Sequence, residues 1–301
     1  MDVVDNFDSS YPSAIKRSNV AHNLDRDGYR LHEIDVRDGA GLDRALQNDY
    51  AVVIHLAGKA GPRQSLIEPA LFEDVNIGGT RTVLDFCVSR AIPRVVFASS
   101  SSVYGVNESL PWTEDAEPRP ISPYAVTKLS AEMLGHMYSQ LHGIGFTALR
   151  FFTVFGPRQR PGLAMYVFAE QMIRGEMISI FGDGTARRDF TYVGDLIPGI
   201  RAAMDRETRS LEIFNLGSNR PVTVLEMVRA LENLLGVEAR IRWCPAESAD
   251  PPATWADIRK AERVLGYRAE TAFEDGVRDF ATWMLARERG SNALAPDGAL
   301  R

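Results

Sequence analysis

The chain has 301 residues, 45% of them hydrophobic and 25% charged, enough for one large or two modest cores, and we expect two lobes. A net charge of −6 leaves no basic field to attract nucleic acid or an anionic membrane. With no apolar run near the ~18 residues of a membrane span and no signal sequence, we expect a soluble protein without membrane partners. The two cysteines, Cys87 and Cys244, lack metal-ligand spacing, which predicts no metal site and suits a reducing cytoplasm.

The first half of the chain alternates between apolar strands and helical stretches. Strands are expected at residues 31–38, 51–56, 94–99 and 146–152, and helices at 69–90 and 123–142. This rhythm predicts an α/β fold with a doubly wound parallel sheet and helices on both faces. His55 lies inside an apolar run, so we interpret it as a packed core histidine.

The composition changes after Gly156, where a smaller α+β lobe is predicted to begin. A helix is expected at residues 165–174 and a short strand at 178–181, and residues 191–206 are expected to return to the first lobe. Thr223 and Glu226 form a capping box that starts another helix, and Gly236 ends that helix. A last amphipathic helix carries Phe273, Val277, Phe280 and Met284, followed by a tail expected to be disordered.

The strongest chemical signal is a serine run followed by a tyrosine and a lysine. The serines end an apolar strand, and the carboxyl edge of such a sheet is where ligands bind. Pro123 suits the start of a helix, which places Tyr124 and Lys128 on one helical face. A phenol titrates near pH ~10, so Tyr124 needs a neighbouring cation such as Lys128 to act as a base. An i,i+4 pair is also ordinary helix surface, but its position after the serine run favours proton transfer at a carbinol carbon.

These residues belong to a larger set of motifs that resembles a known family. The chain resembles the extended short-chain dehydrogenase/reductases, and within them the NAD-dependent nucleotide-sugar epimerases, most closely the UDP-glucuronate and UDP-glucose 4-epimerases. The resemblance covers about residues 3–283 and rests on residues 99–105, 122–128, 150–161, 187–193, 215–217 and 252–257. It implies a Rossmann-like domain over residues 1–155 and about 189–216, a nucleotide-sugar-binding lobe over 156–188 and about 217–288, and a tail at 289–301.

The resemblance implies a reaction and its residues. NAD would accept a hydride from C4 of a UDP-sugar and return it to the opposite face. Tyr124 would take the O4 proton, Lys128 would lower the pKa of Tyr124, and Ser100 would hydrogen-bond O4. The implied cofactor contacts are Asp5, Asn6, Asp35, Val36, Leu56, Ala57, Gly58, Asn76, Ser99, Tyr124, Lys128 and Phe152.

The resemblance also implies a substrate. The implied substrate contacts are Ser101, Ser102, Thr153, Arg160, Phe181 and Arg188. Arg160 matches the position that meets a sugar carboxylate, and Thr153 stands where UDP-glucose epimerases usually have Asn. UDP-glucuronate is therefore expected, with UDP-glucose or UDP-galactose as the alternative. Serines at 101 and 102, where related 4,6-dehydratases carry acids, disfavour dehydration.

Two features depart from the family. Glu247 stands where Arg or Gln is usual near the nucleotide. The first strand and the Gly-x-x-Gly-x-x-Gly turn that binds pyrophosphate do not occur in the sequence. We expect either a start assigned about thirty residues late or a genuine short form, the latter being a catalytically silent binding or partner subunit. By analogy with related epimerases, we expect a homodimer formed through the helices at 69–90 and 123–142.

Overall fold

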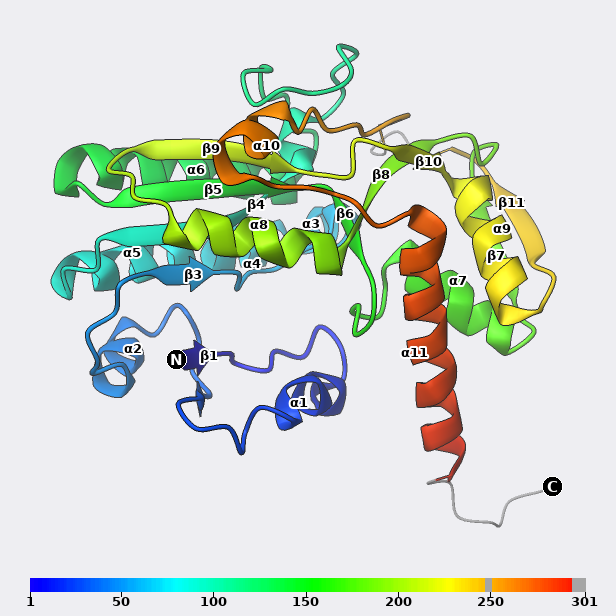
Figure 1. The fold of residues 1–301 in the computed structure, drawn as a ribbon, viewed down its shortest axis with the longest axis horizontal. Coiled ribbons are helices and arrows are strands. Elements are labelled where there is room, and N and C mark those ends of the chain that lie inside the picture. Colours follow the sequence, from blue (N-terminus) through cyan, green and yellow to red (C-terminus); the bar gives the residue numbers. More distant parts are fainter. Residues whose placement is uncertain (247–250, 294–301) are drawn as a thin grey trace.

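The structure, a computed structural model, describes residues 1–246 and 251–293. Its main sheet contains four parallel strands in the order β3 (Val53–His55), β4 (Arg94–Ser100), β5 (Gly145–Phe151) and β9 (Leu211–Leu216) (Figure 1). Alternate side chains of β4 face opposite sides, so Val95 and Phe97 join one hydrophobic cluster and Val96 joins another. Helices α5 (Gly79–Ser89) and α6 (Pro123–His142) cover the first face, and α8 (Val193–Asp205) covers the second. The predicted α/β class with a parallel sheet is confirmed.

The N-terminal strands form a separate parallel pair, β1 (Asp2–Val4) and β2 (Arg30–His32), with α1 (Ser13–Ala21) and α2 (Gly39–Ala45) beside it. Within the described ranges, no ladder joins this pair to β3, at the place where the sequence predicts an absent strand. Ile54 and Leu56, on and just after β3, remain 40% and 53% exposed. The predicted strand at 31–38 is too long, because the Asp35 side chain accepts the Arg37 backbone N–H and turns the chain.

The helix predicted at residues 69–90 is interrupted. It consists of α4 (Pro69–Glu73), a π-helical turn η1 (Asp74–Gly78) and α5, and α3 (Pro62–Ile67) precedes it. The buried Asn76 lies in the π turn. Such turns often occur at functional sites, because the extra residue redirects a side chain.

Helix α6 has the predicted start and a glycine end. The Ser122 hydroxyl accepts the Ala125 N–H at 3.2 Å, Pro123 occupies the first turn, and Gly143 ends the helix with φ of 69°. The serine run begins in β4 and continues into a 3-10 turn, η2 (Ser101–Tyr104). Both motifs therefore lie at the carboxyl end of the main sheet.

The second lobe has its own hydrophobic core, which includes Phe155, Tyr166, Leu231 and Phe280. Its strands are β6 (Thr153–Phe155), β7 (Met177–Phe181), β8 (Arg187–Tyr192), β10 (Pro221–Thr223) and β11 (Arg240–Cys244). Its helices are α7 (Ala164–Ile173), α9 (Val224–Leu235) and α11 (Phe273–Ala293), and the Thr223–Glu226 capping box of α9 is present. Figure 1 shows this lobe beside the carboxyl end of the main sheet.

The domain limits expected from the sequence need two corrections. Helix α10 (Arg259–Leu265) packs on β9 and α8, with Ala261 and Tyr267 in a cluster of the first lobe, because its apolar face completes the second face of the main sheet. Residues 289–293 continue α11 instead of beginning a tail. Residue Glu247 and residues 294–301 lie outside the described residues. Within the described part, no helix is long and apolar enough to span a membrane.

Candidate active site

Tyr124, Lys128 and Ser100 come together at the end of β4. The Lys128 ammonium donates a hydrogen bond to the Ala98 carbonyl at 2.7 Å and lies 6.0 Å from the centre of the Tyr124 ring. Ser100 and Ser102 share a hydrogen bond of 2.6 Å between their hydroxyls. Phe72 packs edge-on against Tyr124, with ring centroids 6.2 Å apart. The structure therefore brings the three predicted catalytic side chains to one place.

Their proton affinities follow from burial and neighbouring charges. Burial lowers the pKa of Lys128 to about 8, an effect that the negative charge of Glu132 partly offsets. Burial raises the pKa of Tyr124, while hydrogen bonding with Ser100 and the positive charge of Arg160 act to lower it. Ser100 and Arg160 thus act on the pKa of Tyr124 in the direction that the resemblance implies for Lys128, and the role of Lys128 stays a prediction. Arg160 is thus an electrostatic neighbour of Tyr124 that sequence reasoning missed.

Asn76 connects the strand-end loop after β3 to helix α6. Its side-chain oxygen accepts the Lys59 backbone N–H at 2.8 Å, and its amide donates to the Lys59 carbonyl at 3.0 Å and the Thr127 hydroxyl at 2.9 Å. A side chain at Gly58 would come 2.9 Å from the Asn76 oxygen and 3.6 Å from the Lys128 ammonium. Only glycine leaves this approach open, which agrees with the loop position predicted for it.

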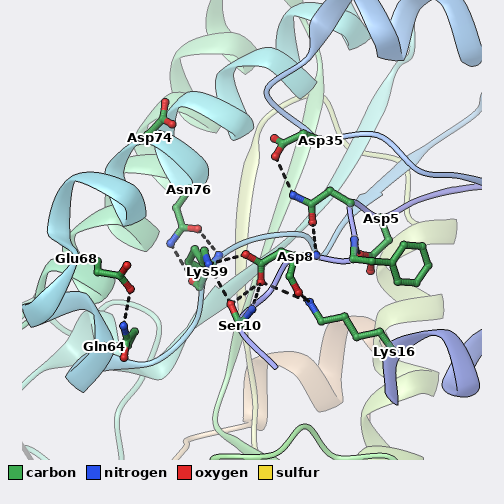
Figure 2. Close-up of polar contacts among 12 residues, drawn as sticks. Asp5, Asp8, Ser10, Lys16, Asp35, Lys59, Gln64, Glu68, Asp74 and Asn76 are labelled. Atoms are coloured by element: carbon green, nitrogen blue, oxygen red, sulfur yellow. Dashed lines mark hydrogen bonds and ion pairs between the residues drawn. The ribbon is translucent and has the colours of Figure 1, made fainter. Parts of the chain in front are cut away.

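A second polar network lies after β1 (Figure 2). Asp8 accepts a 2.6 Å hydrogen bond from Lys59 and its backbone carbonyl accepts one of 2.6 Å from Lys16, so two cations converge on one residue. Although partial burial opposes it, the Lys59 hydrogen bond holds the pKa of Asp8 well below its usual range. Sequence reasoning missed these three residues, because the cluster joins separate elements and forms no contiguous motif.

Three of the implied cofactor contacts, Asp5, Asn6 and Asp35, lie just after β1 and β2. Asp5 is exposed, and one of its oxygens accepts the Phe7 N–H at 2.7 Å. The Asn6 amide donates to Asp35 at 2.8 Å, as Figure 2 shows. Hydrogen bonds from Arg37 hold the pKa of Asp35 well below its usual range, so its carboxylate is ionised at neutral pH.

A cavity of about 1810 Å³ runs between the two lobes. Eleven of the predicted site residues line this cavity: Asp5, Asn6, Asp35, Val36, Leu56, Ala57, Gly58, Thr153, Arg160, Phe181 and Arg188. Ser99, Ser100, Ser101, Ser102, Tyr124, Lys128, Asn76 and Phe152 are not in its lining, although Gly58 brings the wall next to Lys128. The volume exceeds the roughly 300–1,000 Å³ of a pocket for one small ligand, so it has room for two.

The arginines in the second-lobe loops differ in position. Arg160 lines the cavity and donates to the Ala60 carbonyl at 3.2 Å, whereas Arg158 is exposed and contacts His22 outside the cavity lining. Phe181 is stacked by Arg63 at 4.7 Å, a lining residue that the sequence analysis did not single out. Within the described residues, no cluster of three or more His, Cys, Asp or Glu side chains could hold a metal ion.

Comparisons with known proteins agree with this geometry. The family model described as "NAD dependent epimerase/dehydratase family" matches residues 7–217. The chain belongs to this family. UDP-glucuronate 4-epimerase 3 of Arabidopsis thaliana is 38% identical, across 97% of this chain and 72% of that protein.

Two solved epimerase structures share the fold. UDP-glucuronic acid 4-epimerase from Bacillus cereus, in complex with UDP-glucuronic acid and NAD, has a TM-score of 0.89 and 33% identity, covering 95% of this chain and 91% of that one. UDP-glucose 4-epimerase from Thermotoga maritima, with UDP-glucose, has a TM-score of 0.87 and 29% identity, with the same coverage. The predicted epimerase resemblance is therefore confirmed at the level of family and fold.

The residues of this family member fit two parts of NAD. The exposed Asp5 carboxylate suits a ribose hydroxyl, and the Lys128 ammonium, whose recorded hydrogen bond uses one of its three N–H groups, suits a second ribose. The pyrophosphate has no glycine-rich turn to receive it in this sequence. These residues therefore fit the two ends of the dinucleotide.

Proposed function

We propose that this chain catalyses NAD-dependent 4-epimerisation of a UDP-sugar, interconverting UDP-glucuronate and UDP-galacturonate. The observation that carries the proposal is the meeting of Tyr124, Lys128 and Ser100 at the end of β4, beside a cavity large enough for a dinucleotide and a nucleotide sugar. Membership of the epimerase/dehydratase family supports the reaction class.

The side chains of this chain would handle the proton of the sugar hydroxyl. Tyr124 accepts the O4 proton as the C4–H bond breaks, and it returns that proton when C4 is reduced again. Ser100 donates to O4 and holds it near the phenol. The buried Lys128 ammonium stabilises negative charge that develops beside it, because opposite charges interact strongly where water is excluded. Bound NAD⁺ supplies the hydride acceptor and, once reduced, the hydride donor.

The side chains on the second-lobe wall of the cavity favour a substrate that carries a sugar carboxylate. Arg160 offers a forked cation and Thr153 a hydroxyl from the cavity lining. UDP-glucose, the alternative substrate, has a neutral hydroxymethyl group at that position and gains no ion pair. The direct experiment is incubation with NAD⁺ and either nucleotide sugar, followed by NMR detection of the C4 epimer; no conversion of either sugar would contradict the proposal.

A matched pair of arginine variants tests the choice of substrate. Arg160→Met should lower kcat/KM for UDP-glucuronate relative to UDP-glucose by roughly 10–100-fold, because a hydrogen-bonded ion pair is lost. The ratio between substrates is the readout, since Arg160 also affects Tyr124 with either sugar. The exposed Arg158→Met is the control and should leave the ratio unchanged. Equal ratios in both variants would assign carboxylate recognition to another residue.

The alternative function is a catalytically silent binding or partner subunit. The absence of the pyrophosphate-binding turn from the sequence motivates it. Titration with NAD⁺, followed by tryptophan fluorescence or calorimetry, separates the two hypotheses. Binding of the nucleotide sugar without binding of NAD⁺ would favour the silent subunit.

We also propose that two copies associate through α5 and α6. Met133, Met137 and Leu141 are 51%, 43% and 69% exposed, and they recur every four residues along α6. An apolar stripe of this kind is typical of a helix that packs against a partner. This pairing would give a four-helix interface in a homodimer.

A further inference from the structure

Glu132 is a buried carboxylate located one helical turn beyond Lys128 on α6. Its side chain is fully buried, and Arg150 beside it is only 2% exposed. Arg150 forms a bidentate hydrogen-bonded pair with both carboxylate oxygens, with Nε donating at 3.0 Å and Nη2 at 2.8 Å. The Ser99 hydroxyl donates to the same carboxylate at 2.5 Å. These three hydrogen bonds to the carboxylate come from the two strands under the active site.

The two strand residues that Glu132 contacts are direct neighbours in the sheet. Ser99 on β4 pairs with Arg150 on β5, and Ser100 pairs with Phe151 in the next step of the register. A single helix side chain thus ties together both members of one strand pair. The next residue of β4 is the proposed catalytic serine.

Lys128 makes the adjoining connection. Its ammonium donates to the carbonyl of Ala98, the residue immediately before Ser99. Lys128 and Glu132, four apart on α6, therefore attach the helix to two successive residues of β4. Tyr124 lies one further turn toward the start of the same helix, so its position relative to Ser100 depends on this attachment.

The charged groups around Lys128 and Glu132 show which of them can act on the Lys128 ammonium. The titratable or charged groups beside Lys128 and Glu132 are His55 from β3, Arg150 from β5 and Tyr124 on α6. Beyond them, Tyr104 from η2 contacts the Arg150 guanidinium, whose Nη1 also donates to the Glu114 backbone carbonyl, and the charge of Arg160 acts on Tyr124. Burial, together with Lys128, lowers the pKa of His55 to about 3, so this histidine is neutral. Burial raises the pKa of Tyr104 to about 12, and Glu114 points its carboxylate at the Asn215 N–H. Glu132 is the negative group that acts on Lys128.

We propose that Glu132 is a positioning residue: its carboxylate fastens α6 to the paired ends of β4 and β5, and its charge keeps Lys128 in the ammonium form. The inference rests on the proposed function, since it concerns the base and cation of that reaction. Glutamine at this position would lose the charge but keep one acceptor oxygen for Ser99 and the Nε of Arg150, so part of the attachment remains. The two parts of the role can therefore be separated by substitution.

The charge is tested by titrating Lys128 directly. Because the sequence contains only four lysines, ¹³Cε-lysine labelling gives four signals, and neither NAD nor substrate is needed. In the unmodified protein the Lys128 signal should titrate near pH 8. Glu132→Gln removes a negative charge that favours the ammonium, so the midpoint should fall by roughly one pH unit. The other three lysine signals should not move and serve as internal references.

A second set of variants covers the case in which Glu132→Gln folds poorly with Arg150 left unpaired. The double variant Glu132→Gln with Arg150→Met removes both buried charges, which proteins often tolerate. Its Lys128 midpoint should also fall, and the alkaline limb of kcat should move to lower pH with it. Arg150→Met alone should lower the melting temperature without lowering the midpoint.

The outcomes are distinct. A Lys128 midpoint that stays near pH 8 in both Glu132 variants would overturn the proposal and leave the carboxylate a purely structural role. A midpoint that falls in a chain that does not epimerise would support the Glu132 inference while contradicting the proposed function. Because the titration needs no turnover, the two failures can be told apart.

Discussion

Tyr124 is the side chain on which the proposed chemistry depends most directly. Tyr124→Phe keeps the ring that packs edge-on against Phe72 but deletes the proton acceptor. Turnover should fall by roughly 10²–10⁴-fold, while nucleotide-sugar affinity should change little. Steady-state kinetics and equilibrium binding measure the two quantities.

Tyr29→Phe is the control for this substitution. Tyr29 lies just before β2, outside the predicted site residues, and its backbone N–H donates to the Arg26 carbonyl. Turnover should be unchanged in this variant. Turnover retained in Tyr124→Phe would place the base on another side chain.

Residues were predictable from the sequence where chemistry and local spacing coincide. Ser100, Tyr124 and Lys128 were found because a strand end and a helix start each carry a short pattern. Asp8, Lys59 and Arg63 were not singled out, because their contacts join segments that no local pattern links. The effect of Arg160 on Tyr124 was missed for the same reason, since long-range electrostatics depends on the folded distance.

Helix α6 serves two purposes through two of its faces. The face with Lys128 and Glu132 is buried against the main sheet, while the face with Met133 and Met137 is exposed. Its whole length was predictable from a proline start, a glycine end and apolar periodicity. The π turn before α5 was not predictable, because its sequence is compatible with an uninterrupted helix and the buried contacts of Asn76 select the wider turn.

The exposed stripe on α6 leads to a prediction about assembly. If two copies pair through α5 and α6, the unmodified protein should have a dimeric mass by light scattering at micromolar concentration. Met133→Glu with Met137→Glu should produce a monomer, because charged side chains would be desolvated at the interface. Ile197→Glu, on a 51% exposed residue of α8 across the sheet, is the control and should leave the dimer intact. A monomeric mass for the unmodified protein would contradict the proposed homodimer.

At the scale of the whole molecule, the main sheet and the β1–β2 pair are two separate sheets, and no ladder joins β3 to either strand of the pair in the described chain. Unpaired backbone groups and the exposed Ile54 and Leu56 reduce stability there. The same region must also supply the centre of the dinucleotide site, because parallel sheets bind phosphate at the turn after a strand. One structural element, a parallel strand followed by a glycine-rich turn and a helix, would satisfy both requirements.

The final prediction concerns the addition of that element in front of Met1. A segment with the strand, a Gly-x-x-Gly-x-x-Gly turn and a helix should raise the melting temperature, and NAD⁺ at about 100 times its Kd should raise it by roughly 3–5 °C more. The matched control replaces the three turn glycines by alanine, which keeps the added strand but blocks close approach of the backbone to pyrophosphate. This control should keep the first increase and lose the second. The contradicting outcome is that the 301-residue chain itself melts cooperatively and that NAD⁺ raises its melting temperature. The dinucleotide would then be bound without that turn. The network of Lys16, Asp8 and Lys59 beside the cavity would be the first region in which to search for the phosphate contacts.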